Sequence, residues 1–155
     1  MIKAAAFGCV GLLATAFGVV ASCAFAVEPI RLITQEEANL PPATGTGGQT
    51  RNLTRGPGID AVAPPPVAIN GPFRLAVRFK PRNGVPIDPA TVRVTYRRHP
   101  AVDLTYRIKP FVTADGIEAP AVIVPAGKHL IEIEAMDKEG RVGRSQMTLA
   151  VEAAN

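Results

Sequence analysis

The sequence predicts an all-β protein, folded as a sandwich of about seven short strands. Apolar and polar residues alternate along several segments between residues 59 and 155, and turn signals separate these segments at regular spacing. Fifteen prolines and fourteen glycines are too many for a helical bundle and suit a turn-rich β protein. The chain has no Trp, so its core must be built from aliphatic residues and Phe.

The strongest alternation lies in two segments separated by a turn. The first strand is expected from Phe73 to Phe79 and the second from Thr91 to Arg98. Strict period-two alternation gives each strand one buried face and one solvated face. The residues between them include an Asn-Gly and an Asp-Pro pair, so they continue neither strand.

The same pattern predicts strands on both sides of this pair. An edge strand is expected near Ile59 to Ala63, because three prolines follow it. Later strands are expected at Val102 to Ile108, Ile117 to Val124, Ile131 to Ala135 and Met147 to Val151. A hairpin turn at Asp137 to Gly140 connects the last two.

Two segments resemble immunoglobulin-like domains of bacterial proteins. Residues 126–141 are similar to the small-Gly turn, strand and Asp-x-x-Gly hairpin near the end of such domains, and Ile87 to Val94 is similar to their Asp-Pro-x-Thr-Val approach to a middle strand. The resemblance covers residues 59–151 and implies an immunoglobulin-like sandwich, but it specifies function poorly. The chain lacks the inter-sheet cysteine pair and core Trp of antibody domains.

The first 26 residues are expected to be a signal peptide. A positive start is followed by Ala4 to Val20, an uncharged apolar run, which is typical of export signals, although about 20 such residues could also span a bilayer. Ala24-Phe25-Ala26 is a cleavage-type sequence that would release a chain beginning at Val27. Alternatively, Val20 to Cys23 resembles a bacterial lipobox, in which Cys23 would be lipidated and anchor the chain to a membrane.

Residues 27–58 are expected to be a flexible linker, because few large apolar groups occur from Leu40 to Gly58. Thr34 and Glu37 fit a capping box, which predicts a short helix near residues 35–39. Pro41-Pro42 would end it. The predicted domains are therefore a signal peptide at 1–26, a linker at 27–58 and the sandwich at 59–155.

The sequence shows no pattern of catalytic or metal-binding residues. Cys9 and Cys23 both lie in the predicted signal peptide, so no thiol ligand or disulfide is expected in the folded part. His99 and His129 lack the spacing of a metal site, and structural roles are expected for both.

Three aspartates, Asp103, Asp115 and Asp137, could meet at one end of a sandwich and hold calcium. They are not clustered in the sequence, which favours turn-forming roles instead. We therefore expect no metal, no cofactor and no catalysis.

Positive charge is concentrated in the middle of the chain. Residues 71–110 contain nine basic and two acidic residues, whereas residues 111–155 contain four basic and seven acidic residues. One interpretation is a face that binds an anionic polymer. Another is cross-strand pairing, with Arg93 and Arg97 on the same outer face as Glu132 and Glu134.

Any basic face is predicted at Arg74 and Arg78. These residues belong to the opposite sheet, where Glu118 is the one obvious acidic neighbour. The net charge of +4 is too small to indicate nucleic-acid binding.

The expected function is that of an exported module of the bacterial cell envelope, periplasmic, secreted or lipid-anchored, that binds an unknown protein partner or acts as a spacer. Its edge strands would offer unpaired backbone to a partner. The alternative is an accessory domain that binds an anionic or carbohydrate envelope polymer. An exposed aromatic platform would support this alternative, but alternation directs both Tyr96 and Tyr106 inward.

Overall fold

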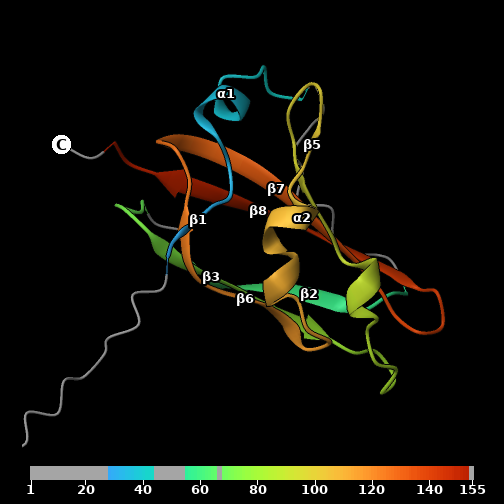
Figure 1. Cartoon of the computed structure of the whole chain (residues 1–155). Coiled ribbons are helices and arrows are strands. Elements are labelled where there is room, and N and C mark those ends of the chain that lie inside the picture. Colours follow the sequence, from blue (N-terminus) through green and yellow to red (C-terminus); the bar gives the residue numbers. More distant parts are fainter. Residues whose placement is uncertain (1–27, 44–54, 66–67, 154–155) are drawn as a thin grey trace, which may run out of the picture.

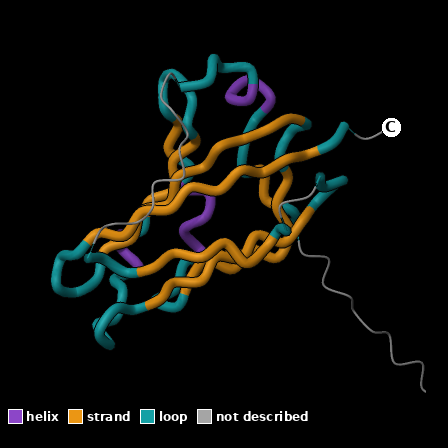
Figure 2. The backbone as a smooth tube through the Cα atoms, turned by 180° about the vertical axis from the view of Figure 1, so that it is seen from behind, coloured by secondary structure: helices purple, strands orange, loops and turns teal. Residues whose placement is uncertain are grey.

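The computed structural model describes residues 28–43, 55–65 and 68–153. These residues form two four-stranded sheets that appear as two layers in Figures 1 and 2. The prediction of an all-β, sandwich-like protein is confirmed. The predicted signal peptide, its cleavage site and Cys23 lie outside the described residues.

The first sheet is built around a central antiparallel pair. Its strands, in spatial order, are β1 (Ile30–Arg31), β6 (Gly116–Ile123), β3 (Phe73–Lys80) and β2 (Gly58–Ala63). The large apolar residues of β3 are buried and its basic residues are exposed, as the alternation predicted. The strand before the prolines, β2, lies at the edge of the sheet, also as predicted.

The second sheet is dominated by a long hairpin. Its strands, in spatial order, are β5 (Val102–Asp103), β4 (Arg93–Tyr96), β7 (Gly127–Met136) and β8 (Val142–Val151). The hairpin turn confirms the prediction for Asp137. One oxygen of the buried Asp137 carboxylate accepts hydrogen bonds from the backbone N–H groups of Glu139 and Arg141, and the other pairs with the Arg141 guanidinium.

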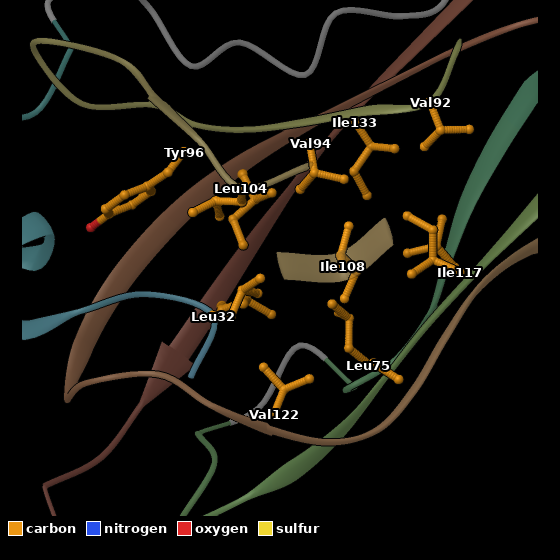
Figure 3. Packing of buried hydrophobic residues seen from close by; sticks show 14 of the residues in the cluster. Leu32, Leu75, Val92, Val94, Tyr96, Leu104, Ile108, Ile117, Val122 and Ile133 are labelled. Carbon is orange, nitrogen blue, oxygen red and sulfur yellow. The ribbon is translucent and has the colours of Figure 1, made fainter. Parts of the chain in front are cut away.

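One apolar core fills the space between the sheets (Figure 3). Leu75, Ile117 and Val122 of the first sheet face Val94 and Ile133 of the second. Each fully buried aliphatic side chain contributes about 1.5–3 kcal/mol relative to an exposed one. Two further segments, described next, also supply core residues.

The predicted strand from Val102 to Ile108 is wrong after Asp103. The chain instead forms helix α2 (Thr105–Ile108) and the 3-10 helix η2 (Lys109–Phe111). Leu104 and Ile108, which α2 directs into the core, are four residues apart, a separation that fits both the two-residue period of a strand and the 3.6-residue period of a helix. The Asp103 carboxylate accepts from the Thr105 backbone N–H and so favours the turn into the helix.

The inward orientation expected for Tyr106 is also wrong. Its side chain is 84% exposed, whereas Tyr96 is fully buried as predicted. In a helix, the residue midway between Leu104 and Ile108 lies on the opposite side from both. The change from strand to helix therefore turns Tyr106 towards solvent.

Residues 28–43 are part of the sandwich, which corrects the linker prediction for this segment. Strand β1 pairs in parallel with β6, and the Leu32 backbone N–H donates to the Ile123 carbonyl at 3.0 Å. Leu32 and Ile33 have no exposed surface. A short run of large apolar residues was thus sufficient to bring this segment into the core.

The helix predicted near residues 35–39 is confirmed as α1 (Gln35–Ala38). The Glu37 backbone N–H donates to the Thr34 hydroxyl, and the Thr34 backbone N–H donates to the Glu37 carboxylate, as in a capping box. Arg107 on α2 then binds the same carboxylate through two hydrogen bonds of 2.7 Å, and it also donates to the Leu32 carbonyl. The bond to Arg107 lowers the pKa of Glu37 to about 2.

The substitution Leu32→Ala is expected to lower the free energy of unfolding by about 2–5 kcal/mol, because it leaves a cavity in the core. Urea denaturation measures this change. Val62→Ala is the control, since Val62 is 51% exposed and the loss there should stay within about 0.5 kcal/mol. Equal, small losses for both variants would show that residues 28–43 do not contribute to the core.

The substitution Glu37→Gln is expected to weaken the fold at neutral pH by about 2–3 kcal/mol. Because the pKa of Glu37 is lower in the folded chain than its ordinary value of 4.5, the stabilisation is complete above about pH 4.5 and is lost as the pH falls towards 2. Urea denaturation across this range should show less acid dependence for Glu37→Gln than for the exposed control Glu36→Gln. An unchanged acid dependence in Glu37→Gln would contradict the role of the ion pair.

Candidate functional site

A cleft of about 230 Å³ lies beside α2, at the side of the second sheet where β5 ends. Its walls come from the 3-10 helix η1 (Pro89–Thr91), the start of β4, the end of β5, and α2 with η2. The side chains that carry polar or aromatic chemistry in it are Arg93, Asp103, Thr105, Tyr106 and Lys109.

Hydrogen bonds to the sheet fix both walls of this cleft. On one side, the Met136 backbone N–H donates to the Thr91 hydroxyl at 3.1 Å. On the other, the Val94 backbone N–H donates to the Thr105 hydroxyl at 3.0 Å, and the Leu104 N–H donates to the Val94 carbonyl at 2.8 Å. The cleft is therefore shaped before any ligand arrives, which lowers the entropic cost of binding.

The lining combines an aromatic ring with charges of both signs. Tyr106 supplies the exposed ring, Arg93 and Lys109 supply positive charge, and Asp103 supplies a carboxylate. The hydrogen bonds from Thr105, together with the charge of Arg93, lower the pKa of Asp103. The cleft can therefore hold a ring against an apolar surface while donating hydrogen bonds from cations and accepting them at one carboxylate.

Sequence reasoning missed this cleft because it treated residues 102–108 as a strand. Two signals favoured the helix: Asp103, which can cap a turn, and Pro110, which suits the first turn of a following helix. With the helix in place, Tyr106 and Lys109 lie three residues apart on its solvent side.

The predicted basic face carries less net charge than its arginines suggest. Arg74 and Arg78 do lie on the outer face of β3, in the sheet opposite to Arg93 and Arg97. However, Arg74 is ion-paired with Glu118, and Asp60, which stands opposite Arg78 in the strand register, is ion-paired with Lys80. This face therefore presents charges of both signs.

The cross-strand ion pairing predicted on the second sheet is confirmed for Arg97 and not for Arg93. Arg93 is in register with Glu134, and Arg97 lies 3.7 Å from the Glu132 carboxylate. Glu134 forms its ion pair with Arg144, which lies across from it on β8. Arg93, by contrast, lines the cleft, where its charge helps to lower the pKa of Asp103.

The structural role predicted for His129 is confirmed. The His129 ring is buried. Its Nε2 lies 2.9 Å from the Pro125 carbonyl oxygen, and its Nδ1 lies 2.7 Å from the Tyr96 hydroxyl. A carbonyl can only accept, so Nε2 carries the proton and the Tyr96 hydroxyl donates to Nδ1. Arg98 donates to the same hydroxyl and to the Leu40 carbonyl, which ties the N-terminal segment to this network.

The remaining candidates do not gather into one site. His99 is exposed, and its backbone N–H donates to the Pro41 carbonyl. Asp103 and Asp137 hold turns through backbone N–H groups, as predicted. Within residues 28–43, 55–65 and 68–153, no three His, Cys, Asp or Glu side chains form a group that could hold a metal ion.

Comparison with known proteins found no matching family model, and no curated protein or solved structure with significant similarity to this chain. None of the helices in the described part of the chain is long and apolar enough to cross a bilayer.

Stability is expected to fall as the pH drops below about 6.5, because burial lowers the pKa of His129 and the unfolded chain then binds the additional proton. The slope should reach at most about 1.4 kcal/mol per pH unit. Urea denaturation between about pH 7.5 and 5.5 should show this slope in the parent and in the His99→Gln control, but not in His129→Gln. A slope that persists in His129→Gln would assign it to another group.

Proposed function

We propose that this chain is an exported, non-catalytic module of the bacterial cell envelope that binds a partner through the cleft beside Tyr106. The observation that carries the proposal is the position of Tyr106. Its ring is 84% exposed on a well-packed sandwich and lines a cleft with fixed walls. Tyr is enriched at binding interfaces, and ligand sites are concave surfaces lined by apolar groups with a few convergent polar ones.

The strand order supports an immunoglobulin-like sandwich. In that fold, strands A, B and E share one sheet, and C, F and G share the other. The sequence β2–β3–β6 matches A–B–E, and β4–β7–β8 matches C–F–G. Strand β1 occupies the place beside β6 that strand D would take, although it pairs in parallel and comes from the start of the chain.

The two buried titratable side chains of the described chain have structural roles. His129 and Asp137 are the buried polar residues of the described chain, and each is bound by structural hydrogen bonds. Asp137 holds the hairpin turn, and His129 joins β7 to Tyr96. Neither side chain is open to a substrate.

Export is inferred from the sequence, and the fold limits how the chain could be tethered. If Cys23 is lipidated, a long stalk before the sandwich would require the predicted linker at residues 27–58, but Ile30 already belongs to the first sheet. Cys23 and Ile30 are joined by six residues, which span at most about 25 Å. A lipid-anchored form would therefore hold the sandwich close to the membrane surface.

Other surfaces are less favoured as the binding site. The Arg74/Arg78 face is partly neutralised by Glu118. Strand β8 is a long edge strand, but Ile69 bonds to the backbone near its end and Pro57 lies against Gly143 near its start. Binding of an anionic polymer at Arg74/Arg78, or of a peptide along β8, is therefore the weaker alternative.

The proposal predicts that the mature chain, residues 27–155, sediments with cell-envelope material from its source bacterium. Tyr106→Ala should weaken this retention by about tenfold or more, because truncating a central aromatic side chain removes a large share of binding energy. Val62→Ala, which truncates another exposed hydrophobic residue in the opposite sheet, is the matched control. Equal retention of both variants would contradict binding at the cleft.

A further inference from the structure

We infer that the cleft beside Tyr106 binds a sugar ring that carries a carboxylate, as one unit of an acidic polysaccharide. This inference rests on the proposed binding function and names its ligand class. It is carried by three features of one site: the exposed ring of Tyr106, the cations Arg93 and Lys109, and the carboxylate of Asp103.

The exposed tyrosine suits a sugar ring. One face of a pyranose presents mainly C–H groups, which pack on an aromatic ring while the hydroxyls at the ring edge stay hydrogen-bonded. Tyr106 has few rotatable bonds, and α2 is held in place by the burial of Leu104 and Ile108, so ordering the platform costs little entropy. Stacking alone would not distinguish a charged sugar from a neutral one.

The charges of the cleft supply that distinction. Arg93 and Lys109 together outweigh Asp103, so the site favours an anion. A guanidinium can bind a carboxylate through two parallel hydrogen bonds. Glu134, the residue in register with Arg93, is ion-paired with Arg144, and Arg93 remains beside the cleft.

The carboxylate of Asp103 argues for a sugar acid over a polyphosphate. An ionised Asp103 repels closely spaced phosphates, but it accepts hydrogen bonds from sugar hydroxyls. Its pKa is lowered by Thr105 and Arg93, so it is ionised at neutral pH. A mixed site of this kind fits a ligand with one negative group and several hydroxyl donors.

The size of the cleft fits a single ring. Its volume of about 230 Å³ lies below the roughly 300–1,000 Å³ of pockets that enclose drug-sized ligands. Because Tyr106 is largely exposed at the rim, neighbouring units of a polymer could continue into solvent. The smaller hollow of about 140 Å³ near Arg74 and Glu118 is lined by no aromatic ring, so it offers no stacking surface for a sugar.

The test uses a matched pair of probes, an oligomer of galacturonic acid with free carboxylates and the same oligomer with its carboxylates methyl-esterified. Each is titrated into the mature chain, residues 27–155, labelled with ¹⁵N. The free acid should shift the amide signals of residues 89–112, and its Kd should be about tenfold or more lower than that of the ester.

Four variants separate the contributions of the ring and the charges. Tyr106→Ala should weaken binding of both oligomers by about tenfold or more, whereas Tyr106→Phe should keep it. Arg93→Gln and Lys109→Gln should each reduce the preference for the free acid while leaving the ester unaffected. Lys128→Gln removes an exposed positive charge at the other end of the sheet and should change neither Kd.

Equal affinity for acid and ester, or binding that survives Tyr106→Ala, would overturn the assignment of a carboxylated sugar to this cleft. Failure of the free-acid oligomer to bind would overturn it as well. Sedimentation with envelope material then decides the wider proposal. If retention still depends on Tyr106, the cleft binds a different ligand and the proposed binding function stands. If retention does not depend on Tyr106, the binding function and the sugar ligand are both rejected.

Discussion

The structure depends on the burial of Leu32 and Ile33 between the two sheets. Because the chain after β5 forms α2 in place of a further strand, the outer edge of β6 is left to the N-terminal segment, which pairs with it through β1. Arg107 on α2 binds both the Leu32 carbonyl and the Glu37 carboxylate. The same short helix thus closes the core on its inner side and presents Tyr106 on its outer side.

This arrangement also explains what happens to the positive charge of residues 71–110. Arg98 and Arg107, which belong to the apparent basic excess, donate to backbone carbonyls of the N-terminal segment. Arg74 and Arg97 lie in cross-strand ion pairs, and solvent screens such pairs strongly at a surface. Arg93 and Lys109 line the cleft, where their charge can act on a ligand. A basic stretch of sequence was therefore a poor guide to a basic surface.

Local patterns were sufficient to predict the strands with strict alternation, the Asp137 hairpin and the Thr34 capping box, because each depends on neighbouring residues. The pattern failed at Leu104 and Ile108, whose spacing satisfies two periods at once. It also failed at Leu32 and Ile33, whose partners lie about ninety residues later in the chain. The cleft could not be predicted because it depends on both of these segments. Helix α2 places Tyr106 beside the cleft, and the N-terminal segment holds α2 in position.

The most direct test is hydrogen exchange of the Leu32 backbone amide in the native mature chain. This N–H donates to the Ile123 carbonyl, so the account predicts that it exchanges as slowly as the core amides of β3 and β7, through global unfolding. Exchange at the rate of an unstructured peptide, while β3 and β7 stay protected, would contradict it. The N-terminal segment would then be a tether, and the support for α2 and its cleft would be lost.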